Sequence, residues 1–174
     1  MGDEGIASFM GQIEVDPSKV ECIVIAMYMD AAYMGEFTWP EFLKGSKALG
    51  VDSIAGWKRL VSRFREEANI ESKFAEIYRF SFKFAQEKHK KNVDVDLACD
   101  IWSLLLSKKC SFLDKWIQFV NGKKERGEIL VITKDTWDLF YDLVKQTRGN
   151  ISNFEDDGAW PSMIDDFVAF MNAQ

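Results

Sequence analysis

Residues 30–41, DAAYMGEFTWPE, have the frame of an EF-hand loop. The side chains at pattern positions 1, 6, 8 and 12 match that frame: Asp30, Gly35, Phe37 and Glu41. Calcium also needs oxygen ligands at positions 3 and 5, where this chain has Ala32 and Met34. We therefore expect an EF-hand-like pair of helices around a loop that binds neither calcium nor another metal.

Helical periodicity extends from this loop in both directions. Apolar residues recur at intervals of three and four, and capping residues divide the pattern into segments. The expected helices cover approximately residues 6–13, 17–34, 38–50, 54–64, 72–84, 94–106, 112–120, 134–148 and 161–174. The interval 122–133 is the expected long loop. The pattern predicts an all-α fold, with approximate halves at 1–85 and 86–174 packed into one domain.

Length and composition exclude several classes of protein. A chain of 174 residues with 47% apolar and 29% charged residues is typical of one folded domain. The longest apolar run, residues 22–29, is far shorter than the roughly 20 residues that cross a bilayer, so we expect no membrane span and no secretion signal. Three scattered cysteines predict no disulfide framework and fit a reducing compartment in the cytoplasm or nucleus.

The negative charge is concentrated near the end of the chain. The net charge is −6, and residues 150–174 contain no Lys or Arg. The carboxylates of this segment are Glu155, Asp156, Asp157, Asp165 and Asp166. They form either a solvated acidic face or a docking surface for a basic partner. Nucleic acid is disfavoured, because the overall charge has the wrong sign for phosphate binding.

Catalytic patterns are missing from the sequence. The chain has no GxGxxG, GxxxxGK[ST] or GxSxG motif, so no cofactor is expected. Its only histidine, His89, lies in the basic run 88–91 and suits neither a zinc ligand nor a general base. Adjacent carboxylates such as Asp165 and Asp166 point to different faces of a helix and do not form an acid/base pair.

Several motifs together resemble the potentiating-neddylation domain of the defective-in-cullin-neddylation family. The C-terminal third contains Lys-Asp-Thr-Trp at 134–137, Ser-Asn-Phe-Glu-Asp-Asp-Gly-Ala-Trp-Pro at 152–161 and Ile-Asp-Asp-Phe-Val at 164–168. Shorter matches occur earlier, including Glu36-Phe37, Leu49-Gly50 and Phe112-Leu113-Asp114. The resemblance spans essentially the whole chain.

The resemblance implies two EF-hand-like halves without calcium and a scaffold-type co-E3 that contributes no catalytic residue. Its implied partners are the C-terminal domain of a cullin, the neddylation E2 conjugating enzyme and a RING protein. The motif positions that match the family's cullin contact are Asp135, Ala159 and Asp165. We further expect a monomer that lacks the family's N-terminal ubiquitin-binding (UBA) domain.

A second implied site is an apolar pocket for the N-acetylated methionine of the E2. Its matching positions are Ile6, Ile23, Ala26, Phe37, Phe84 and Leu104, with Cys22 in the wall. Met34, Gly35 and Ile101 depart from the side chains usual in the family, and the loop 122–133 is longer than usual. Two other interpretations stay open: a calcium-regulated switch, and a helical adaptor for another basic protein.

Overall fold

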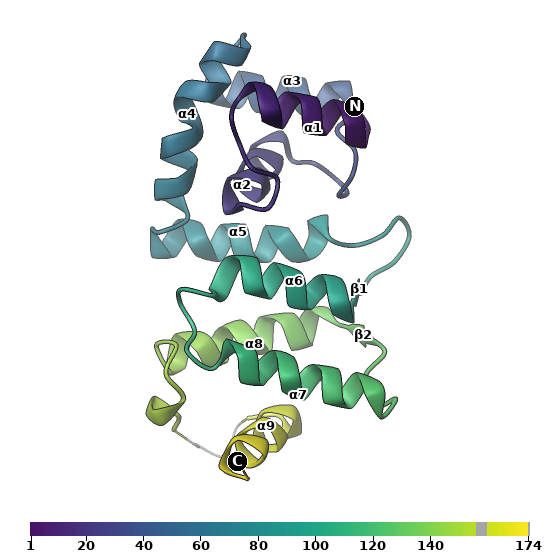
Figure 1. Ribbon diagram of the computed structural model, residues 1–174, viewed down its shortest axis with the longest axis vertical. Coiled ribbons are helices and arrows are strands. Elements are labelled where there is room, and N and C mark those ends of the chain that lie inside the picture. The colour runs from purple at the N-terminus through teal and green to yellow at the C-terminus, as the bar shows by residue number, and fades with distance from the viewer. Residues whose placement is uncertain (156–159, 174) are drawn as a thin grey trace. The chain divides into compact units, whose positions relative to one another are not determined.

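The computed structural model describes residues 1–155 and 160–173, and these residues form a helical protein with one short strand pair (Figure 1). The elements are α1 Asp3–Gln12, α2 Val20–Met29, α3 Trp39–Leu49, α4 Ile54–Glu67, α5 Glu71–Phe84, β1 Val93–Asp94, α6 Val95–Leu106, α7 Leu113–Glu125, β2 Val131–Ile132, α8 Lys134–Gln146, a 3-10 turn Ile151–Asn153 and α9 Ser162–Asn172. The expected all-α class is confirmed. The chain divides into two compact units, Met1–Lys91 and Asn92–Gln174.

Helix α2 is the centre of the first unit, where it packs against α3, α4 and α5. Its apolar run explains this position, because a helix that is hydrophobic on all sides must be covered on all sides. Val24, Ile25, Ala26 and Met29 are all fully buried. The N-terminal half therefore has a core built around one short, almost entirely apolar helix.

Two buried carboxylates connect α4 to α2. Glu21 of α2 accepts a hydrogen bond from Arg65 Nε at 2.7 Å. Glu67 of α4 accepts from Arg63 Nε at 2.7 Å and from the hydroxyl of Tyr28 at 2.8 and 2.9 Å. Each buried charge thus has a hydrogen-bonded partner, which burial of a carboxylate requires.

The segment 30–41 turns sharply between α2 and α3. Asp30 and Gly35 take positive φ values of 51° and 86°. The Asp30 carboxylate accepts from Lys44 Nζ at 2.6 Å, and the Glu41 carboxylate accepts from the backbone amides of Ala32 and Thr38. Protein groups therefore already contact both acidic ends of the EF-hand-like frame.

Local capping signals located four helix termini correctly. Thr38 and Glu41 form the expected capping box at the start of α3, and Gly50 ends that helix with φ 66°. Ser53 caps α4 by accepting from Gly56 N, and Asp94 caps α6 by accepting from Asp96 N.

The expected helix over residues 17–34 is shorter than predicted. The carboxylate of Asp16 accepts hydrogen bonds from the amide and hydroxyl of Ser18, which makes a local turn, and α2 begins only at Val20. The left-handed conformation of Asp30 ends the helix at Met29. The polar residues on both sides of the apolar run therefore form turns.

The second unit contains α6 to α9 and the short antiparallel ladder. Val93 pairs with Ile132 and Asp94 with Val131, so the ladder joins the segments that precede α6 and α8. The long loop expected over 122–133 is also shorter than predicted, because α7 continues to Glu125 and β2 begins at Val131. None of the described helices is both long enough and apolar enough to cross a membrane.

Gly149 offers a test of close packing in the second unit. It has φ 72°, and a Cβ added there would lie 1.9 Å from the carbonyl oxygen of Lys109. We expect Gly149→Ala to lower the free energy of unfolding by about 2–4 kcal/mol, because backbone must move to accommodate the methyl group.

The matched control is Gly127→Ala, since Gly127 has φ 73° and open space around it. This substitution should lower the free energy of unfolding by only about 1 kcal/mol, which is the cost of the positive φ for a residue with a side chain. Urea unfolding followed by circular dichroism measures both variants. Equal decreases in the free energy of unfolding would show that contact with the Lys109 carbonyl does not determine the cost at Gly149.

Candidate functional site

Two of the three residues expected to contact a cullin lie on exposed helix starts in the second unit. Asp135 lies in the first turn of α8, and Asp165 lies in the first turn of α9. Both side chains are exposed. Ala159, the third expected residue, lies outside the described residues.

The position of Asp135 follows from the start of α8. Thr133 accepts a hydrogen bond from Thr136 N at 3.2 Å and so caps the helix directly after strand β2. Trp137 and Phe140 on the same helix are fully buried. With this face in the core, Asp135 is directed to the opposite, solvent side.

The position of Asp165 follows from the packing of α9 against α7. Ile164 and Phe167 are fully buried, and the ring of Phe167 lies 5.1 Å from Trp116 and 5.4 Å from Phe119. Figure 1 shows α9 lying next to α7 in this unit. The apolar side of α9 is thereby covered, and Asp165 is left exposed.

The acidic side chains of α8 and α9 differ in their ionic partners. Asp138 pairs with Lys134, Asp142 with Lys145 and Asp166 with Lys123. Among the ion pairs of the described residues, none involves Asp135 or Asp165. The two carboxylates selected by the motif match are therefore those still free to pair with a cation of another molecule.

The residues expected to bind the E2 methionine are mostly inaccessible side chains. Ile23, Ala26, Phe37 and Phe84 of the first unit are buried. Ile6 and Cys22 are half-buried, and Leu104 is half-buried in the second unit. Most of these side chains are therefore part of the core of their own unit, and their role in E2 binding stays a prediction.

A shallow pocket of about 340 Å³ lies at the loop between α2 and α3 in the first unit. It is lined by Asp3, Tyr33, Met34, Gly35, Glu36 and Lys88. Met34 N donates to the carbonyl oxygen of Phe84 at 3.0 Å, which joins the rim of the pocket to the backbone at the end of α5. Met34 and Gly35, the positions that depart from the family, thus form part of its rim.

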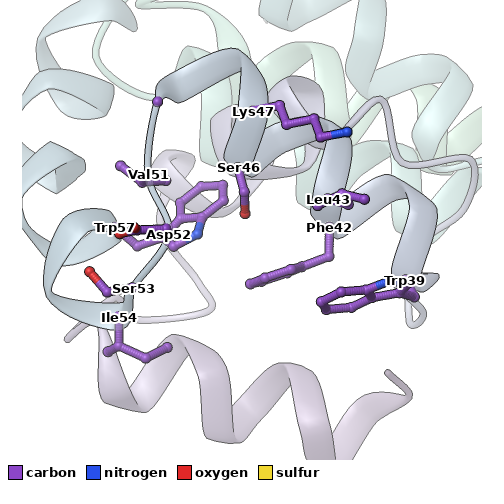
Figure 2. Close-up of a pocket in the computed structure, with 11 residues that line it drawn as sticks. Trp39, Phe42, Leu43, Ser46, Lys47, Val51, Asp52, Ser53, Ile54 and Trp57 are labelled. Carbon is purple, nitrogen blue, oxygen red and sulfur yellow. The ribbon is translucent and has the colours of Figure 1, made fainter.

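The sequence did not reveal a larger groove of about 660 Å³ along α3 and the start of α4 (Figure 2). Trp39, which is 70% exposed, stacks with Phe42 at a centroid distance of 6.0 Å. Ile54 and Trp57 come from the other side of the groove. None of the residues expected to bind the E2 lines it. A tryptophan in a capping box can be core or surface, so periodicity alone could not identify this feature.

The cysteines lack the surroundings of a nucleophile. Burial raises the pKa of Cys22 and of Cys110 to about 12, and that of Cys99 to about 11. Within residues 1–155 and 160–173, no group of three or more His, Cys, Asp and Glu side chains could hold a metal ion.

The described residues form an all-helical fold in which α8 and α9 present carboxylates without ionic partners. The chain belongs to the cullin-binding family, because residues 56–170 match the family described as "Cullin binding". It is 34% identical over 171 residues to DCN1-like protein 5 of Rattus norvegicus, covering 97% of this chain and 69% of that protein. It is 31% identical over 174 residues to DCN1-like protein 5 of Homo sapiens, and the match covers 100% of this chain and 72% of that protein.

DCN1-like protein 3 of Xenopus tropicalis is 33% identical over 169 residues, which cover 95% of this chain and 55% of that protein. The similarity therefore includes both units. The resemblance to the defective-in-cullin-neddylation family is confirmed.

The raised thiol pKa values predict slow cysteine chemistry in the native state. At pH 7.5 a thiol of pKa about 11 or 12 is less than ~0.1% thiolate, whereas a free cysteine of pKa ~8.5 is about 10% thiolate. Labelling with dithionitrobenzoate should therefore be at least ~100-fold slower than for free cysteine. In guanidinium chloride all three thiols should react rapidly. A thiol that reacts at the free-cysteine rate in the native protein would contradict the assignment.

Proposed function

We propose that this protein is a scaffold-type co-E3 for cullin neddylation, which binds a cullin and the neddylation E2 and contributes no catalytic group. The main support is that Asp135 and Asp165 remain without an ion pair, whereas Asp138, Asp142 and Asp166 have lysine partners. Membership of the cullin-binding family makes a basic surface of the cullin C-terminal domain the proposed partner.

The proposed mechanism is the raising of effective concentration. A scaffold that holds the cullin and the charged E2 at once converts an encounter between them into an intramolecular event, which strengthens assembly by ~10²–10⁴. It also orients the E2 thioester toward the acceptor lysine of the cullin. The RING protein bound to the same cullin completes the assembly.

The proposed E2 site is the apolar surface of the first unit around Phe37 and Phe84. The 340 Å³ pocket with Met34 and Gly35 on its rim is the opening to which we assign the methionine, because Met34 is hydrogen-bonded to the backbone of Phe84. An acetylated methionine suits such a site, because acetylation removes the ammonium charge that would otherwise lose its hydration. The remaining amide needs only ordinary hydrogen bonds.

Charge reversal tests the cullin surface. Asp135→Lys and Asp165→Lys replace attraction with repulsion toward a basic partner, and each should weaken binding to a cullin C-terminal fragment by about 30-fold, or about 2 kcal/mol. Both side chains are exposed, so the folded state should persist. Isothermal titration calorimetry measures the affinity, and thermal unfolding checks the fold.

The control is Asp100→Lys, an equally large charge change at an exposed position on α6. It should change the affinity for cullin by less than about threefold. If all three variants weaken binding equally, general charge and not this surface determines affinity. If the wild-type protein binds other basic proteins but no cullin, the helical-adaptor alternative replaces the proposal.

Acetylation of the E2 amino terminus tests the apolar site. An acetylated E2 N-terminal peptide should bind about 100-fold more tightly than the free-amine peptide, which corresponds to about 2.7 kcal/mol. Phe84→Leu should reduce this preference, because Phe84 is 7% exposed and loses apolar contact when shortened. The charge-reversed variant Asp135→Lys is the matched control and should bind the peptide normally. Equal affinity for the two peptides would contradict the site.

A further inference from the structure

Two adjacent carboxylates on α9 have different surroundings. Asp166 Oδ2 lies 2.9 Å from Lys123 Nζ on α7, whereas Asp165 has no ionic partner within the described residues. Lys123 Nζ also lies 2.9 Å from Glu128 Oε2, and its side chain is only 14% exposed. These two hydrogen bonds raise the pKa of Lys123, so the ammonium stays charged at neutral pH.

The Lys123–Asp166 ion pair lies beside an aromatic contact between the same two helices. Phe119 precedes Lys123 by one helical turn, and Phe170 follows Asp166 by one turn. The rings of Phe119 and Phe170 lie 5.7 Å apart, and the Lys123 ammonium lies 5.3 Å from the centre of the Phe119 ring. The ion pair thus adds a polar contact to the aromatic contacts that Phe167 and Phe170 of α9 make with α7.

Together, these polar and aromatic contacts restrict rotation of α9 about its axis. Successive residues of an α-helix are about 100° apart around the axis. With Asp166 directed to Lys123, Asp165 is therefore turned about 100° away from α7 and remains exposed. The ion pair adds a directional constraint to the aromatic packing, because the energy of a hydrogen bond falls steeply as its angle departs from linear.

We propose that Lys123 is a positioning residue that fixes the rotation of α9 and neutralises Asp166, so that Asp165 is the carboxylate of this pair that meets a basic partner. This inference rests on the proposed cullin contact. It explains why the side chain of Lys123 is only 14% exposed, although α7 carries no residue expected to contact a cullin. Lys123 acts through Asp166 and Asp165 and does not itself contact the partner.

The neighbouring lysine provides a matched control. Lys124 pairs with Asp96 of α6 at 2.5 Å, so Lys124→Met removes one positive charge without touching α9. Lys123→Met removes the same charge and keeps most of the apolar stem, but it also releases Asp166. Glu128 retains Arg126 as a partner in this variant.

Two measurements separate positioning from simple charge. Hydrogen exchange of the α9 amides in the free protein should be about fivefold faster in Lys123→Met than in wild type, and unchanged in Lys124→Met. Dissociation from a cullin C-terminal fragment should be about fivefold faster in Lys123→Met alone. Extra negative charge by itself would instead raise the association rate equally in both variants.

Rescue and a double-mutant cycle complete the test. Lys123→Arg should restore both rates, because a guanidinium also bridges two carboxylates. Lys123→Met should have no further effect in an Asp166→Asn background, since the pair is already broken. Unchanged α9 exchange, equal effects of the two Met variants, or a Lys123 effect that persists in the Asp166→Asn background would overturn the inference while wild-type binding stays intact. If the wild-type protein does not bind the fragment, the proposed function fails and this inference fails with it.

Discussion

The aromatic contacts of Trp116 are the interaction on which the second unit depends. This side chain is fully buried on α7, its ring lies parallel to that of Phe140 on α8 at 4.3 Å, and its edge contact with Phe167 on α9 is 5.1 Å. Each such pair contributes about 0.5–1.5 kcal/mol beyond the area it buries. One residue thereby holds both helices whose exposed ends carry Asp135 and Asp165.

This arrangement includes a local cost. In the part of the chain that the structure describes, the indole N–H of Trp116 is buried without an acceptor. An unsatisfied donor of this kind costs about 1–3 kcal/mol. The ring contacts with Phe140 and Phe167 offset that cost. The apolar centre supplies the stability that the exposed carboxylates of Asp135 and Asp165 do not.

Local signals predicted the helix termini that depend on one side chain and a nearby amide. Thr38 and Asp94 are examples, because capping involves only residues within one turn. The predicted start of α2 was wrong. Asp16 can either cap a helix or form a local turn, and the same sequence permits both. The predicted end of α7 was also wrong, because Gly122 lies within the helix although glycine often marks a helix end.

The candidate site was predictable only where a local sequence motif identifies a residue. Motif matching located Asp135 and Asp165, and their exposure agrees with a contact role. The partner of Asp166 was not predictable, because Lys123 is 43 residues away in sequence and meets it only through packing of α7 on α9. Composition had indicated a broadly acidic tail. Among the tail carboxylates that the structure describes, Asp166 is neutralised by Lys123, whereas Asp165 stays available, and a charge of fixed direction favours a defined basic surface over general attraction to any cationic partner.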